Sequence, residues 1–495
     1  MVLRLKVLVG SGREIVSKSQ PTLQGYGRSE LAAHRARTAA VCAEHLRRRG
    51  GPAMFAGRDG EGFGFGEGAG TAGEAVARYL DTLDSAPALL GLGEPTHGVE
   101  AFPLLRNRII EHLVRYRGFR SVAIEIDGLA GRIVDAFITG GEGDVDEVME
   151  RGFSHEFGAL PSNRALVAWL REYNADRAPA DRVRFYGFDG PMEMMSAPSP
   201  RAALMGAHGY LVEHLGQARV RHTAERIDGL LGYDAVWAAE AAMMDAAQSV
   251  GDTDAARALR AIADDLLALM EAEAPTLREA SSDAAYRDAH LLIRTSLGLL
   301  RYHSAMAWTA PMAERLAALG GLRDAMMAAN LRAVASAEAE RGPTLVFAHN
   351  AHLWKRRTAM DMGGMAVRWW CAGALIAPEL KDRYVVIASD TAEAEGTDAA
   401  EGDPGSLQGV LSQALASGGP RAREGALFPA DALRGAGTDG RVLQARSDLK
   451  DPRYIPIDGL DGMDAVAFIR GGGGERVLWG GEDGGGDADQ PSRTS

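Results

Sequence analysis

The sequence predicts an α/β protein with a three-layer α/β/α core, a mostly parallel sheet and a helical insertion. From about residue 72, apolar runs of strand length alternate with amphipathic runs of helix length, the pattern of parallel α/β sheets. Between residues 209 and 340 the strand signal stops, and long Ala- and Leu-rich runs with helical periodicity replace it. Strand-like runs return at residue 344, so we expect the helical segment to interrupt one core.

The expected core elements can be placed in chain order. A helix at about 74–83 precedes the first strand, a helix at about 99–116 precedes the second, and a helix at 162–174, with Ser162 as its N-cap, precedes the third. The expected strands are residues 88–93, 120–126, 182–188, 344–348, 384–388 and 465–470. Residues 391–442 are rich in Ala, Gly and Asp, and we expect irregular surface segments there.

Composition sets the expected domain boundaries. A basic, Gly-rich extension, with a linker at 57–71, precedes the core, and a Gly- and Asp-rich tail follows it; we expect both to be disordered. The expected parts are the extension at 1–71, the first part of the core at 72–208, the helical subdomain at 209–340, the completion of the core at 341–470 and the tail at 471–495.

Bulk properties exclude several functional classes. The net charge of −13 disfavours a nucleic-acid-binding role. No apolar run reaches the roughly 18 residues of a membrane span, and the basic N-terminus lacks a signal-peptide cleavage site. Two cysteines are too few for a disulfide framework or a Cys-based zinc site. We therefore expect a cytoplasmic protein with no nucleic-acid partner and no membrane segment.

Acids and histidines follow the carboxyl ends of four expected strands. The first strand runs into GLGEPTHG at residues 91–98, which contains Glu94 and His97. The other three strands run into Glu125, into Asp189 and into HNAH at residues 349–352. Ligands of parallel sheets bind in the crevice at these ends, so the pattern predicts a catalytic cleft. Structural roles stay open, because a Glu can serve a helix N-terminus and an Asp before Gly-Pro can be a turn residue.

Two further side chains can reach this cleft. Arg106 lies beside the apolar stripe of the helix that follows the motif, and we expect it to pair with Glu125. Such a guanidinium can fix the geometry of the acids, or it can be a structural ion pair between helix and sheet. His155, in the loop before the helix at 162–174, can also reach the cleft.

The residues fit two chemistries. In one, a neutral His acts as general base on water, a carboxylate orients it, and an Arg or a second His stabilises the oxyanion. In the other, Glu94, His97, Glu125 and His349 bind a divalent metal that activates water, although the HNAH spacing is a weak metal signal. No G-x-S-x-G elbow indicates a serine nucleophile, and GLGEPTHG is not a dinucleotide fingerprint.

Several motifs, in order along the chain, resemble the erythromycin esterase family. They are LLGLGEPTHG, FPLLR ending at Arg106, SVAIE ending at Glu125, WLREYN, FYGFD ending at Asp189, RDAMMAAN at 323–330 and VFAHNAH ending at His352. The resemblance covers roughly residues 75–390. It implies a three-layer α/β/α core with a helical portion and, in some members, metal-independent hydrolysis of macrolide lactones in antibiotic resistance; other members serve biosynthetic pathways.

The resemblance also implies roles for individual residues. His97 would activate water beside Glu94, with Arg106, Glu125 and His349 completing the site, while Arg323 would anchor the substrate or stabilise the oxyanion. The candidate catalytic residues are therefore His97, Glu94, Glu125, Arg106 and His349, and the candidate substrate-binding residues are Arg323, Asp189, His352 and Asn350. We expect a small-molecule ester or lactone as substrate and no cofactor. A metal-dependent hydrolase, an acyl-transfer or cyclisation enzyme and a non-catalytic binder are the alternatives.

Overall fold

The computed structural model describes residues 62–66, 70–193, 196–392, 406–417, 424–435 and 454–471. The predicted basic extension up to residue 61 and the predicted tail from residue 472 lie outside the described residues. Among the described helices, none is both long and apolar enough to cross a membrane.

An eight-stranded mixed sheet forms the centre of the protein, in the order β1-β9-β10-β8-β2-β5-β3-β4. The strands from β10 to β4 are parallel, while β9 runs antiparallel to β10 and the edge strand β1 runs antiparallel to β9. The bounds are β1 (Phe63–Phe65), β2 (Leu89–Glu94), β3 (Ser121–Asp127), β4 (Arg184–Asp189), β5 (Thr344–His349), β8 (Tyr384–Thr391), β9 (Gly425–Pro429) and β10 (Ala465–Ile469). Every predicted strand forms, and the predicted mostly parallel sheet is confirmed.

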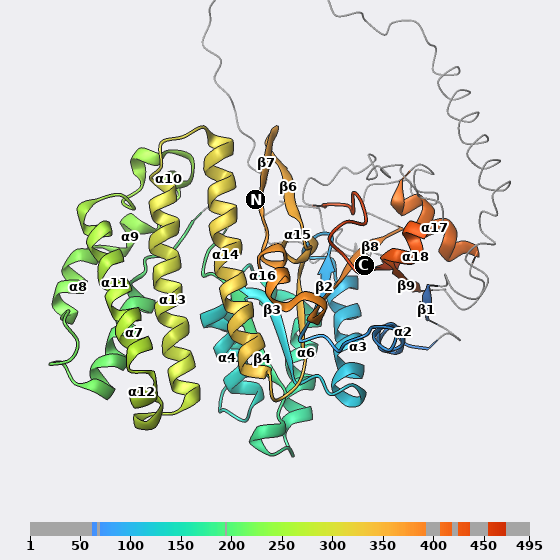
Figure 1. Ribbon diagram of the computed structural model, residues 1–495, viewed down its shortest axis with the longest axis horizontal. Coiled ribbons are helices and arrows are strands. Elements are labelled where there is room, and N and C mark those ends of the chain that lie inside the picture. Colours follow the sequence, from blue (N-terminus) through green and yellow to red (C-terminus); the bar gives the residue numbers. More distant parts are fainter. Residues whose placement is uncertain are drawn as a thin grey trace, which may run out of the picture.

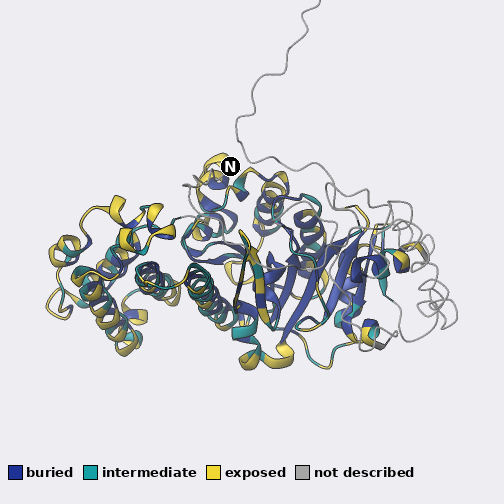
Figure 2. Ribbon diagram, turned by 90° about the horizontal axis from the view of Figure 1, so that it is seen from above, coloured by how far each residue is buried: buried dark blue, intermediate teal, exposed yellow. Residues whose placement is uncertain are grey.

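Helices cover both faces of the sheet, which confirms the three-layer core (Figures 1 and 2). Successive strand residues point to opposite faces: Leu90 and Leu92 join one apolar cluster and Leu89 joins the other. One layer contains α2 (Ala72–Leu80), α3 (Ala101–Tyr116), α4 (Gly128–Ile138), α5 (Val145–Gly152) and α6 (Pro161–Asn174). The other contains α14 (Met312–Glu338), α15 (Asn350–Leu353), α16 (Ala372–Leu380), α17 (Leu407–Ser417) and α18 (Ala430–Gly435).

A group of helices lies to one side of this core and is filled by its own apolar cluster (Figure 1). It contains α7 (Arg201–Leu215), α8 (Ala224–Leu231), α9 (Asp234–Trp237), α10 (Ala241–Met244), α11 (Asp254–Ala272), α12 (Ala274–Ala280) and α13 (Asp283–Met306). Helix α14 contacts both α13 and β4, so it joins this group to the sheet. The expected division of the chain into domains stays a prediction.

A separate β-hairpin and four short 3₁₀ helices complete the described elements. The hairpin is β6 (Arg357–Met362) with β7 (Met365–Trp370), and β7 packs on α14. The 3₁₀ helices are Phe157–Ala159, Pro179–Asp181, Ala246–Gln248 and Lys381–Arg383.

Three local features differ from the sequence-based expectation. Phe63–Phe65, placed in a linker, form the edge strand β1 against β9. Residues 391–442, expected to be irregular, contain α17, β9 and α18. The N-cap prediction for Ser162 is wrong, because α6 begins at Pro161, whose ring suits the first helical turn, and Leu160 occupies the capping position.

Gly93, at the end of β2, is required by the close approach of α15. A Cβ atom on Gly93 would lie 2.1 Å from Asn350 Oδ1. The Asn350 amide cannot easily move away, because Nδ2 donates to the Ser389 carbonyl and Oδ1 accepts from the Ser389 N–H. We therefore expect Gly93→Ala to lower the free energy of unfolding by about 1–3 kcal/mol, the range for overpacked sites.

Gly209 provides the matched control, because it lies within α7 and a Cβ there would meet no atom within 4 Å. Gly209→Ala is expected to raise the free energy of unfolding by about 0.5–1 kcal/mol, since Ala favours helix. Urea unfolding of both variants measures the two effects. Changes of the same sign would contradict this explanation.

Candidate active site

Four adjacent strands deliver polar side chains to one edge of the sheet. In the order β2-β5-β3-β4, their carboxyl ends carry Glu94, His349, Glu125 and Asp189. Glu94 and His349 are directly paired in the register of β2 and β5. All four residues are buried. These four residues therefore lie together at the strand ends, where the sequence predicted a crevice.

His97 is held by Glu94 and directs its other ring nitrogen toward Glu125. Nδ1 lies 2.7 Å from Glu94 Oε1, and Nε2 lies 3.7 Å from Glu125 Oε1. Because a carboxylate only accepts, the bond to Glu94 suits the tautomer with its proton on Nδ1, which has its lone pair on Nε2. The Nε2–Glu125 distance is too long for a hydrogen bond. The His97 side chain is 34% exposed and that of Glu94 only 4%, so His97 is the accessible member of this pair.

Glu125 is the centre of the cluster. Its Oε1 accepts from Arg323 Nη2 at 3.1 Å and lies 3.3 Å from His352 Nε2, and its Oε2 accepts from the His349 backbone N–H at 2.7 Å. Burial alone would raise the pKa of Glu125, but His352, His97 and Arg323 face it and lower that pKa to about 2. Glu125 is therefore a carboxylate throughout the physiological range.

His352 is clamped between two buried carboxylates. Its Nδ1 lies 2.8 Å from Asp324 Oδ1, and Asp324 also accepts from Trp369 Nε1 and from the Ala372 N–H. Burial lowers the pKa of His352, yet Asp324 and Glu125 outweigh burial and raise it above its usual range. Both ring nitrogens face carboxylate oxygens, which only accept hydrogen bonds, so this geometry suits the imidazolium form of His352 beside Glu125.

Arg323 connects the last strand to this centre. Its Nε donates to Asp189 Oδ1 at 3.0 Å, while Nη2 reaches both Asp189 and Glu125. The Asp189 side chain is fully buried, and the Arg323 side chain is 28% exposed. Burial would raise the pKa of Asp189, but Arg323 and His155 hold it well below its usual range. Arg323 is thus an accessible cation in the cleft.

Arg106 is buried at the site, although its predicted ion pair with Glu125 does not form. Its Nε and Nη2 donate to Asn107 Oδ1 at 3.0 and 2.8 Å, and its guanidinium lies over the Phe347 ring. Burial lowers the pKa of Arg106 to about 10, which Glu94 and Glu100 only partly offset. The side chain still lies beside Glu94 and Glu125. A small cavity is lined by Glu94, Pro103, Arg106, Ile124, Glu125, Phe157, Leu160, Asn163, Phe347 and Ala348.

His349 and Asn350 are bonded to backbone groups. His349 Nε2 donates to the Pro95 carbonyl at 3.0 Å, and Nδ1 accepts from the Ala351 N–H at 3.1 Å, so the ring is neutral. Burial and the nearby His97 lower its pKa to about 3. The Asn350 amide is bonded to Ser389. The catalytic role of His349 and the substrate-binding role of Asn350 stay predictions, and this geometry favours positioning roles for both.

Two parts of the network were not assigned from the sequence. Asp324 orients His352, and its only signal is its place beside Arg323 in RDAMMAAN. Glu193 bonds to His155 in a loop whose path carries no periodic pattern. Asp324 lies within α14 and Glu193 lies in the loop beyond the end of β4, so the strand-end rule did not find them.

The residues do not fit a divalent metal. Among the described residues, no three His, Cys, Asp or Glu side chains converge as metal ligands. One member of the predicted ligand set, His349, is also committed elsewhere, because both of its ring nitrogens are bonded to backbone groups. We therefore derive no catalytic step through a metal.

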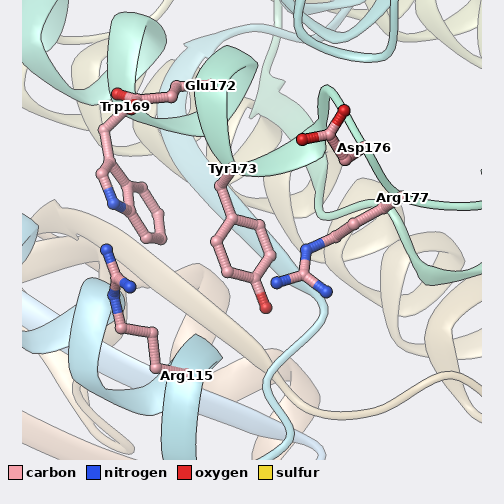
Figure 3. Close-up of a pocket in the computed structure, with 6 residues that line it drawn as sticks. All are labelled: Arg115, Trp169, Glu172, Tyr173, Asp176 and Arg177. Atoms are coloured by element: carbon pink, nitrogen blue, oxygen red, sulfur yellow. The ribbon is translucent and has the colours of Figure 1, made fainter.

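A second hollow lies away from this cluster, between α3 and α6 (Figure 3). It is lined by Arg115, Trp169, Glu172, Tyr173, Asp176 and Arg177. The Arg177 guanidinium lies 3.8 Å from the centre of the Tyr173 ring, and Arg115 pairs with Glu111. The hollow is lined by no histidine, and its two carboxylates, Glu172 and Asp176, are exposed to solvent, so the strand ends remain the candidate active site.

A protein family and an individual protein match the sequence of this chain. The family described as erythromycin esterase matches residues 114–428. Erythromycin esterase type II of Escherichia coli is 31% identical over 103 residues, or 21% of this chain. That match spans only 23% of the relative's length.

Three solved structures share the fold. A Bacillus cereus protein has a TM-score of 0.59 and 18% identity, covering 83% of this chain and 94% of that one. A succinoglycan biosynthesis protein has a TM-score of 0.57 and 18% identity, with coverages of 80% and 91%. A variant of the erythromycin esterase EreC, in its open conformation, has a TM-score of 0.57 and 17% identity, with coverages of 81% and 95%.

Proposed function

The chain belongs to the erythromycin esterase family, a family of ester hydrolases, and we propose that it cleaves a carboxylic ester or lactone with a water molecule activated by His97. The observation that carries this proposal is the His97 ring, fixed by Glu94 at Nδ1 and one-third exposed to solvent. A macrolide-type lactone is one candidate substrate, as the name of the Escherichia coli relative suggests.

The reaction would begin with water bound at His97 Nε2. As the water oxygen attacks the ester carbonyl carbon, its proton moves to Nε2, and Glu94 stabilises the imidazolium through Nδ1. The tetrahedral intermediate then collapses with cleavage of the bond to the alcohol oxygen. His97 returns its proton from Nε2 to that oxygen, giving a carboxylic acid and an alcohol, or one hydroxy acid from a lactone.

Cations around Glu125 are placed to stabilise the negative charge that develops on the carbonyl oxygen. Arg323 is the accessible one, and His352 lies on the other side of the same carboxylate. Preorganised donors of this kind contribute most where water is excluded, as it is around these buried acids. Arg106 is fully buried beside Glu94 and would act by holding the acids rather than by touching substrate.

A panel of lactones and simple esters, incubated with the wild type and with His97→Ala, tests the function by product mass. Addition of one water, dependent on His97, is the expected result. An acyl-transfer or cyclisation product would instead support the alternative enzymes, and binding without any change of mass would support a non-catalytic binder. The assay is repeated after complete metal removal by a chelator, and unchanged turnover is expected because the site does not fit a metal.

A further inference from the structure

His155 lies between two carboxylates at the outer end of the catalytic network. Its Nε2 is 3.2 Å from Asp189 Oδ2, and its Nδ1 is 2.8 Å from Glu193 Oε2. Its backbone N–H also donates to Glu193 Oε1. Carboxylate oxygens only accept hydrogen bonds, so both ring nitrogens must donate to make these contacts. The geometry therefore corresponds to an imidazolium.

The chain bends sharply to deliver this ring. His155 and the next residue, Glu156, have φ angles of 57° and 56°, a left-handed conformation that residues with a Cβ atom rarely adopt. Hydrogen bonds fix the bend on both sides: Ser154 Oγ accepts from the Asp127 N–H, and the Phe157 carbonyl accepts from the Asn163 side chain. A loop held so firmly in an unfavourable conformation indicates that the position of the ring matters.

A continuous series of contacts joins His155 to the proposed base. Asp189 is shared between His155 and Arg323, and Arg323 extends on to Glu125, which faces His97. The Phe157 ring also touches both histidines, with ring centres 5.6 Å from His155 and 5.2 Å from His97. His155 touches none of the groups that would react, so it can act only through its neighbours.

We propose that His155 is a positioning residue whose imidazolium form shares Asp189 with Arg323 and thereby keeps Arg323 extended onto Glu125. This inference rests on the proposed ester hydrolysis. Without the His155 charge, the buried Asp189 carboxylate would have Arg323 as its sole cation, and the guanidinium would withdraw toward it. Glu125 would then lose its hydrogen bond from Arg323, and turnover would slow.

The groups around His155 make its charge dependent on pH. It is faced by Asp189 from β4, Glu193 from the following loop, Asp127 from the end of β3 and Arg323 from α14. Burial lowers the pKa of His155, but Asp189 and Glu193 outweigh it and raise that pKa to about 9. Because the folded-state pKa is the higher one, the ordering of Arg323 is complete below the unfolded value and is lost as the pH rises through about 9.

The experiment compares His155→Gln and Glu193→Gln with a matched control, His222→Gln. His222 pairs with Asp265 at 2.8 Å, and its side chain is 16% exposed, the same as that of His155, but it lies in the helical group. Two readouts are used: nitrogen NMR of labelled histidine rings from pH 6 to 10, and the pH profile of kcat and KM on whichever ester of the panel is hydrolysed.

In the wild type, both His155 ring nitrogens should be protonated at pH 7.5. His155→Gln should move the ring titration of His352 to higher pH, because Glu125 loses its share of Arg323, and it should lower kcat about ten- to a hundredfold with little change in KM. Glu193→Gln, which removes only the outer carboxylate, should move the alkaline limb of kcat to lower pH. His222→Gln should leave all of these unchanged.

A singly protonated His155 ring at pH 7.5 would overturn the proposal. The proposal would also be overturned if His155→Gln or Glu193→Gln behaved like the control, His222→Gln, in both the His352 titration and the pH profile of kcat. If no ester is hydrolysed while the NMR effects appear, the proposed hydrolysis fails and the positioning network stands.

Discussion

Replacing His97 by alanine is expected to lower kcat by on the order of a thousandfold, the effect of removing a general base. The reason is geometric: the His97 side chain is 34% exposed, whereas His349 and His352 are buried, and one nitrogen of the His97 ring is already fixed by Glu94. His349 cannot replace it, because both of its nitrogens are bonded to backbone groups. His352 cannot replace it either, because its two ring nitrogens face the carboxylates of Asp324 and Glu125.

The fold should survive this substitution. The His97 side chain is one-third exposed, and its loss removes one hydrogen bond to Glu94, a cost of about 1–2 kcal/mol. Thermal unfolding and kcat are measured on the same preparation, with His222→Ala as the matched control. Full esterase activity in folded His97→Ala would show that another group activates the water.

Replacing Arg323 by methionine is expected to have the largest combined effect on stability and activity. The substitution leaves two buried carboxylates, Glu125 and Asp189, without the guanidinium that joins them. Breaking a buried ion pair lowers the free energy of unfolding by about 3–5 kcal/mol. Because Arg323 is partly exposed, we expect a loss near the lower end of this range. Loss of a cation beside the developing oxyanion should also lower kcat/KM at least about a hundredfold.

Arg332→Met is the matched control, since Arg332 lies on the same helix and pairs with Glu379 where both side chains are exposed. Such surface pairs contribute about 0–1 kcal/mol. The folded-state pKa of Asp189 lies below its unfolded value, so the stabilisation by Arg323 is present above about pH 4 and is lost as the pH falls below it. Urea unfolding at pH 7 and pH 3 should show the gap between wild type and Arg323→Met closing. Equal stabilities of the two methionine variants at pH 7 would refute this account.

The core and the centre of the site could be predicted because they rest on local patterns. Strands such as β2 and β5 are buried on both faces and appear as uninterrupted apolar runs, and parallel strands bring Glu94, Glu125 and Asp189 to one edge. The edge strand β1 has only three residues among glycines, so its sequence signal was too short.

The outer parts of the site depend on tertiary contacts. Helical periodicity placed Arg106 beside the apolar stripe, and its side chain lines a cavity with Glu94 and Glu125, but its partner is the neighbouring Asn107, which a stripe of apolar residues does not specify. Asp324 reaches His352 from a helix that is far away in sequence, and His155 reaches Asp189 only because the chain adopts a left-handed bend. No periodic pattern in the sequence predicts either contact.

The central claim, that His97 activates water for direct attack on an ester carbonyl, is tested most directly by a single turnover in water enriched in oxygen-18, with enzyme in excess over substrate. We expect one labelled oxygen in the product carboxylate from the first turnover and no label in the enzyme. A first-turnover product without label, with the label found in the side chain of Glu94 or Glu125 instead, would show that a carboxylate is the nucleophile and would contradict it.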